Sequence, residues 1–184
     1  MPGNPFAELL TRIDRLERAL EGRSIEVPVW AAIARLAYTV RVARNTDQVI
    51  PTGGVTALSW NTEDWDYGDM WSSANPTRLY APANGVYMVG ATVQAQAGQI
   101  TGVFRFGLHV RINGNEYQST QDPPTANGID TGRSVAALVR LLTGQYAEVY
   151  AQHTKGSNLT IPAVPGTPAH RQQNSGWMYL VRAL

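Results

Sequence analysis

The sequence predicts an all-β domain, an antiparallel sandwich or barrel, behind one short N-terminal helix. From Thr39 onward, apolar residues recur at every second position within short segments, as they do in half-buried strands. Turn signals rich in Gly, Pro and Asn separate these segments. No part of the chain shows the strand–helix alternation of a parallel α/β sheet.

Residues 1–22 are expected to form a helix that associates with copies of itself. Asn4 can cap this helix, and Pro5 suits its first turn. Apolar residues then follow at alternating spacings of three and four, the a/d pattern of a coiled coil: Phe6, Leu9, Ile13, Leu16 and Leu20. A lone helix this short is marginal in water, so we expect it to be a stalk joining several copies. Packing of a single amphipathic helix on its own domain is the alternative.

Residues 23–38 are expected to link this helix to the β domain at 39–184. Within the linker, Pro28–Tyr38 fits either a short helix or an extended segment, and we favour the helix. Its apolar face would contain Val29, Ile33 and Leu36.

The strands of the β domain are predicted from period-two alternation and from the turns between them. Asn113-Gly114 is a strong hairpin signal between two of these segments. The predicted strands are Val40–Val42, Val86–Gln96, Phe104–Ile112, Glu116–Thr120, Val135–Leu142, Tyr146–His153 and Trp177–Val181.

Several of these strands are apolar on both faces, whereas a sandwich with one wet face should alternate with polar residues. Charged residues make up only 16% of the chain, below the usual value of about 25%. We therefore expect the second apolar face to contact other copies of the chain. The candidate interface residues are Leu138, Leu142, Tyr146 and Tyr150.

Composition argues against several classes of function. The chain has no cysteine, which excludes disulfides, thiolate metal sites and cysteine nucleophiles. The 15 basic and 14 acidic residues balance to a net charge of +1, so we expect no nucleic-acid partner. No apolar run reaches the length of a membrane span, and charges at Glu8, Arg12 and Asp14 disfavour a signal peptide. We expect no cofactor and no membrane insertion.

An acidic segment interleaved with aromatic residues is the first candidate site. It contains Glu63, Asp64, Trp65, Asp66, Tyr67, Asp69 and Trp71, and we interpret it as a solvated or partner-facing loop. Clustered carboxylates suit calcium, with Asp66 and Asp69 as the ligands if calcium binds. The spacing does not fit an EF-hand, because position 75 is Asn rather than the closing Glu.

Basic side chains and two long loops supply the other candidates. Arg105, His109 and Arg111 share one face of a predicted strand, which would meet an acidic surface, a glycan, a neighbouring copy or only solvent. The loops 121–133 and 154–176, the second with His170 and Arg171, either contact a glycan or receptor or cap the ends of the sandwich. No catalytic or nucleotide-binding motif is present.

The order of several short motifs resembles the C1q/TNF-like jelly-roll family. The matching residues are Trp60-Asn61, Trp65-Asp66-Tyr67, Pro82–Val89 with its Gly-Val-Tyr-Met-Val, Leu142–Val149 with Gln145 in place of the family's acid, and Ser175–Leu180. The resemblance covers roughly residues 39–184. It implies a jelly-roll sandwich of about ten strands that forms a homotrimer, some members binding calcium, and that lacks enzymatic activity.

The start of the domain is similar to versions found in tailed-phage virion proteins. The similarity lies in Arg44-Asn45 followed by Ile50–Gly53. We therefore expect a virion structural protein, assembled in the host cytoplasm, that serves as a capsid decoration or head fibre and contacts the major capsid protein. A receptor- or glycan-binding tail-fibre tip is the first alternative, and a cellular C1q-like binding protein is the second.

Overall fold

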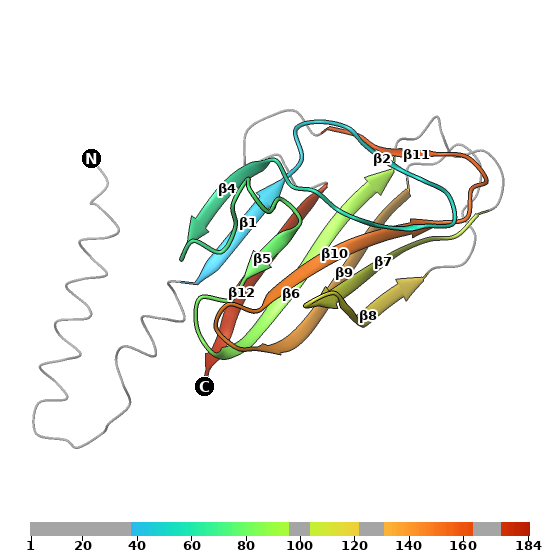
Figure 1. The fold of residues 1–184 in the computed structure, drawn as a ribbon. Helices are drawn as coiled ribbons and strands as arrows, with labels where there is room; N and C mark the ends of the chain where they lie inside the picture. The colour runs from blue at the N-terminus through green and yellow to red at the C-terminus, as the bar shows by residue number, and fades with distance from the viewer. Residues whose placement is uncertain (1–37, 96–103, 122–130, 164–173) are drawn as a thin grey trace, which may run out of the picture. The chain divides into compact units, whose positions relative to one another are not determined.

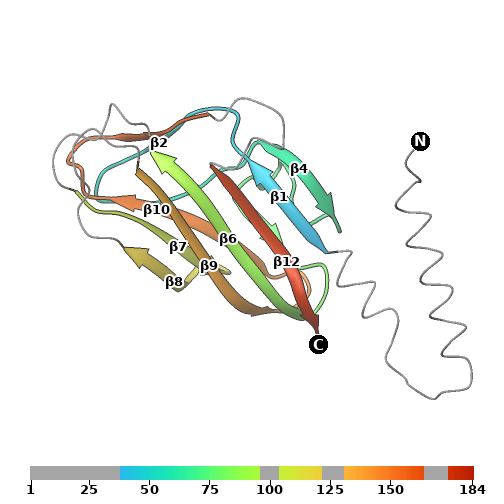
Figure 2. The same ribbon diagram turned by 180° about the vertical axis from the view of Figure 1, so that it is seen from behind.

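The computed structural model describes residues 38–95, 104–121, 131–163 and 174–184, which form an antiparallel β sandwich (Figures 1 and 2). Every regular element among these residues is a strand, which confirms the predicted all-β class. Among them no helix has the length and apolar character needed to cross a membrane. The stalk residues 1–22 and the linker up to residue 37 lie outside the described ranges.

The first sheet has the strand order β4–β1–β12–β6–β9, with antiparallel pairing throughout. Its strands are β1 (Thr39–Ala43), β4 (Thr62–Tyr67), β6 (Gly85–Ala95), β9 (Thr131–Leu141) and β12 (Ser175–Ala183). The first and last described strands, β1 and β12, are therefore neighbours in its interior.

The second sheet has the order β3–β10–β7–β8, and β5 also pairs with β10. Its strands are β3 (Val55–Ala57), β5 (Arg78–Tyr80), β7 (Phe106–Ile112), β8 (Asn115–Gln121) and β10 (Tyr146–His153). A small third pair joins β2 (Gln48–Ile50) to β11 (Leu159–Ile161). The chain passes from one sheet to the other between β6 and β7 and again between β8 and β9, as in a jelly roll.

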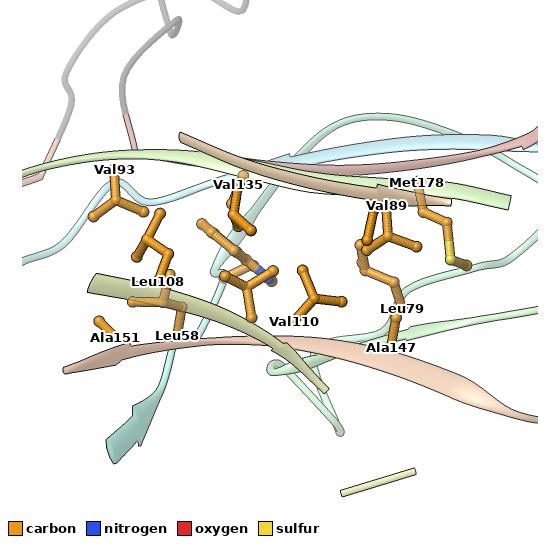
Figure 3. Close-up of a cluster of buried hydrophobic side chains, with 14 of the residues drawn as sticks. Leu58, Leu79, Val89, Val93, Leu108, Val110, Val135, Ala147, Ala151 and Met178 are labelled. Carbon is orange, nitrogen blue, oxygen red and sulfur yellow. The ribbon is translucent and has the colours of Figure 1, made fainter. Parts of the chain in front are cut away.

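The hydrophobic core lies between the two sheets (Figure 3). It forms because every second residue of each long strand points inward. Val89, Val93, Val135 and Met178 come from the first sheet, and Leu108, Val110, Ala147 and Ala151 face them from the second. All eight are at most 3% exposed, which fixes the register of both sheets.

All the strands predicted from period-two alternation are present, with small differences at their ends. The predicted hairpin joins β7 to β8, and Asn113 and Gly114 have φ angles of 49° and 83°. Positive φ at both positions is what a type I′ turn requires.

The prediction that the acidic–aromatic segment is a loop was wrong for its first half. Thr62–Tyr67 forms β4, at the edge of the first sheet beside β1. Trp65 and Tyr67 lie on the same face of β4. Asp64 Oδ2 lies 3.4 Å from Nε of Arg41 on β1. Pairing with β1 and this ion pair outweigh the low strand propensity of the acidic residues.

Candidate interaction surfaces

Aromatic side chains gather on the outer face of the first sheet. The pairing places Tyr67, Thr39 and Tyr179 in one row across β4, β1 and β12, and Trp65, Arg41 and Trp177 in the next row. Trp65 is 37% exposed, Tyr179 41% and Tyr67 61%. These rings therefore form a surface feature rather than part of the core.

A glycine on the neighbouring strand leaves the space in which the Trp177 ring lies against the sheet. Gly90 on β6 pairs with Trp177, and a Cβ at position 90 would lie 2.3 Å from the indole Cζ2 atom. The indole thus occupies the space that any other side chain would fill. Tyr179 stacks beside it, with ring centroids 5.8 Å apart and planes inclined by 23°.

An open hollow of about 380 Å³ lies among these rings, and we call it the aromatic hollow. Its lining side chains include Trp65, Trp177, Tyr179, Thr39, Thr92, Ser175 and Arg41. The Arg41 guanidinium lies 5.3 Å from the centroid of the Trp65 ring, and its Nε lies 3.4 Å from Asp64 Oδ2. The positive charge in the lining is therefore paired within the chain.

A second exposed apolar group follows the edge where β8 meets β9. It consists of Tyr117, Leu138 and Leu142, which are 55%, 52% and 48% exposed, and we call it the β8–β9 stripe. The Tyr117 hydroxyl donates a 2.9 Å hydrogen bond to the Leu138 carbonyl, which links the two sheets at this edge. The methyl groups of Leu138 and Leu142 in this stripe are therefore partly exposed to solvent.

The predicted interface residues Tyr146 and Tyr150 lie on the outer face of the second sheet, opposite to Leu138 and Leu142. The guanidinium of Arg78 lies 4.2 Å above the Tyr146 ring, and that of Arg111 lies 4.4 Å above Tyr150. Both tyrosines are half-buried by these contacts. The four residues predicted for one interface are therefore divided between two surfaces.

Glu148 is the centre of the polar network on this second face. It is 5% exposed and accepts hydrogen bonds from the Thr77 hydroxyl at 2.7 Å and the Tyr150 hydroxyl at 3.0 Å. Arg78 Nε lies 3.4 Å from it as an ion pair. Burial raises the pKa of the Tyr150 phenol, and the hydrogen bond to Glu148 raises it further. The network serves packing within the chain.

The prediction of a shared basic face for Arg105, His109 and Arg111 needs correction at His109. Its side chain is buried, with 3% of the residue exposed, between β8 and β10 in the middle of the sheet. Its Nδ1 lies 3.5 Å from Glu116 Oε1, and neither ring nitrogen makes a hydrogen bond. Arg105 is exposed and Arg111 is half-buried, so the three do not form a solvated row.

The turn after β4 engages the residues proposed for calcium. Asp66 accepts the backbone N–H of Met70 at 3.0 Å and that of Trp71 at 2.8 Å, one with each carboxylate oxygen. The Trp71 indole donates to the Pro76 carbonyl at 3.3 Å and packs on the core. Asp69 has a φ of 52° in the same turn. Within the described ranges, no three His, Asp or Glu side chains gather as metal ligands would.

Two predicted site residues remain, both in the second long loop. His170 and Arg171 lie outside the described residues. Sequence reasoning missed Arg41, Trp177 and Tyr179 as site residues. The alternation Trp177–Met178–Tyr179 was its available signal, because it puts two aromatic rings on the face opposite the buried Met178.

Comparison with known proteins bears on the fold. No family model matches the sequence, and no curated protein matches it. The globular domain of zebrafish complement 1qA protein is 13% identical, with a TM-score of 0.54 over 80% of this chain and 99% of that one. The Eiger TNF of S. frugiperda is 10% identical, with a TM-score of 0.55 over 80% of this chain and 94% of that one. These likenesses confirm the C1q/TNF-like jelly-roll fold and concern the fold alone.

Proposed function

We propose that this chain is a non-enzymatic structural protein that forms a homotrimer and displays its jelly roll on a tailed-phage virion. The role that fits best is a capsid decoration or head-fibre protein that contacts the major capsid protein. The observation that carries the self-association is the β8–β9 stripe. Its three side chains are each about half exposed, and exposed apolar groups of this kind mark sites of protein association.

The contact surface we propose is narrower than the one predicted from the sequence. Leu138 and Leu142 are about half exposed, whereas Tyr146 and Tyr150 are already covered by arginines of the same chain. Burying one Leu side chain fully contributes about 1.5–3 kcal/mol. Copies that meet through Leu138 and Leu142 therefore gain more than copies that meet through the tyrosines.

The trimeric state and the virion location rest on resemblance. The motifs quoted above and the C1q/TNF-like fold favour a trimer, and Arg44-Asn45 with Ile50–Gly53 favours a tailed-phage origin. The non-enzymatic role fits the second sheet, where the buried carboxylate of Glu148 is used in contacts to Thr77 and Tyr150.

Sedimentation velocity on the full chain tests the stripe. Leu138→Glu places a charge in the proposed contact, so at about 1 μM we expect a trimer for the parent protein and mainly monomer for the variant. Val49→Glu is the matched control, because Val49 is also 52% exposed but lies on β2. A parent chain that stays monomeric at tens of micromolar contradicts the trimer.

Mass spectrometry of purified virions tests the location. We expect peptides of this chain in particles of the phage that encodes it, in amounts comparable to a capsid component. A virion preparation with complete coverage of the major capsid protein but no peptide of this chain removes the structural role.

A further inference from the structure

We propose that a pocket on the second sheet binds a sugar acid, that is, a small carboxylate that also carries hydroxyl groups. The pocket has a volume of about 230 Å³ and lies where β7 begins and β10 ends, and we call it the Arg105 pocket. It is lined by Arg105, Gly107, Gln152, His153 and Thr154. This function goes beyond the structural role proposed above and uses other residues.

The Arg105 pocket lies away from the surface through which the copies are proposed to meet. Gly107 pairs with Gln152 across β7 and β10, which lie side by side in Figure 1. Both residues face outward from the second sheet, because their neighbours Leu108 and Ala151 point into the core. The β8–β9 stripe lies near the turn at 113–114, at the other end of the β7–β8 hairpin, and on β9 of the first sheet. Association through the stripe therefore leaves the pocket open.

The lining favours a polar ligand with one negative charge. None of the five described lining residues is acidic or has an aliphatic side chain. Arg105 is exposed, and its guanidinium has no hydrogen-bond or ion-pair partner among the described residues. A guanidinium binds a carboxylate through two parallel hydrogen bonds, and one cation balances one carboxylate. A phosphate dianion would keep an uncompensated charge here.

Two further side chains suit the hydroxyl groups of such a ligand. Thr154 Oγ1 accepts the backbone N–H of Arg105 at 3.0 Å, which leaves its own O–H to donate. The Thr154 N–H donates in turn to the Arg105 carbonyl at 3.1 Å, so the two positions are fixed before a ligand binds. The half-buried Gln152 amide is able both to donate and to accept.

Gly107 and His153 set the shape of the pocket. Gly107 has no side chain to fill the outer face between its neighbours. His153 serves as a wall, because both ring nitrogens are used within the chain. Its Nε2 lies 2.7 Å from the Ile50 carbonyl oxygen, and its Nδ1 accepts the N–H of Lys155 at 3.3 Å. The volume is below the range of about 300–1,000 Å³ that drug-sized ligands occupy, so the pocket suits a single small unit.

A buried histidine next to the pocket has polar atoms without a partner. His109 follows Gly107 as the next residue on the same face of β7 and is 3% exposed. Neither ring nitrogen makes a hydrogen bond, and Glu116 Oε1 lies 3.5 Å from Nδ1. Buried polar atoms without a partner are uncommon in folded proteins. A ligand over Gly107 lies beside this ring, and a hydroxyl group is able to serve it as donor or acceptor.

Ligand-observed NMR titration of the full chain with glucuronate and N-acetylneuraminate tests the pocket. Glucose, acetate, phosphate and a hexaglutamate peptide are the comparison ligands. We expect at least one sugar acid to bind at millimolar concentration, and more tightly than every comparison ligand. Arg105→Gln removes the guanidinium from an exposed position and should weaken this binding about tenfold or more. Arg182→Gln is the matched control, because Arg182 is also exposed but lies on β12, and its affinity should stay within about twofold of the parent.

Gly107→Val is a second variant, which fills the pocket without changing its charge. We expect it to lose sugar-acid binding while its circular dichroism stays that of the parent, and Arg105→Gln decides if this variant does not fold.

Three outcomes overturn the proposal. The first is the absence of binding by both sugar acids at millimolar concentration. The second is a comparison ligand that binds as tightly as the better sugar acid, and a tighter hexaglutamate peptide would indicate an acidic protein partner instead. The third is an unchanged affinity in Arg105→Gln. Sedimentation of Leu138→Glu is measured separately, so failure of the pocket leaves the structural role standing.

Discussion

Tyr87 shows how one buried hydroxyl ties a turn to the core. Its ring is fully buried, and its hydroxyl donates to the Ala83 carbonyl at 2.7 Å and accepts from the Ala83 N–H at 3.3 Å. Tyr87→Phe keeps the ring but leaves both backbone groups of Ala83 without this partner. We expect the free energy of unfolding in urea to fall by about 1–3 kcal/mol. A change below about 0.5 kcal/mol contradicts this role.

The same residue predicts a loss of stability in alkali. Burial raises the pKa of the Tyr87 phenol above its ordinary value of 10.0. A phenol is neutral when protonated, so the folded state holds its proton more tightly than the unfolded state. The stabilisation is complete below pH 10 and is lost as the pH rises through the folded pKa. Urea midpoints of the parent should fall as the pH rises above 10, and those of Tyr87→Phe should fall less steeply.

Glu148 contributes to the raised pKa of its neighbour Tyr150. Burial is the largest cause of the raised pKa of Tyr150, and the Glu148 carboxylate adds to it. Glu148→Gln removes the negative charge while keeping the shape of the side chain. We expect the Tyr150 pKa to move down in phenolate absorbance titrations near 295 nm, with Tyr150→Phe used to assign the signal. An upward movement is incompatible with the geometry of this network.

At the scale of the strands, Gly90 and Gly176 allow the rings of Trp177 and Trp60 to lie against the backbone. Gly176 on β12 faces the buried Trp60, and a Cβ there would lie 2.6 Å from the ring Cζ2. Gly176→Ala must displace a rigid core ring, so we expect a loss of about 1–3 kcal/mol or more in urea unfolding. Gly132→Ala in β9 is the control, since no atom lies within 4 Å of its Cβ position. The control should be neutral or slightly stabilising.

Sequence reasoning recovered the long strands but missed the short ones. β6, β9 and β12 have 11, 11 and 9 residues, enough for a period of two to stand out. β2, β3, β5 and β11 have three residues each, too few to show any period. β4 was missed for another reason, because its acidic residues are uncommon in strands and its Trp65–Tyr67 alternation was interpreted as a loop.

The candidate site was less predictable than the fold, because it depends on which strands become neighbours. Trp65 and Trp177 are more than a hundred residues apart and meet only because β1 pairs with both β4 and β12. His109 looked solvent-facing beside Arg105 and Arg111, yet the strands on either side of β7 bury it. Period two assigns residues to a face but does not say what covers that face.

For the whole molecule, we expect the N-terminal stalk and the β8–β9 stripe to act together in one assembly. Both contacts join the same copies, so when one forms it raises the effective concentration of the surfaces that make the other. Ile13→Asp/Leu16→Asp should therefore shift the full chain from trimer toward monomer by light scattering, as Leu138→Glu does. Combining all three substitutions should give a monomer even at about 100 μM, where each change alone leaves some trimer. An unchanged mass for Ile13→Asp/Leu16→Asp would show that the jelly roll assembles without its stalk.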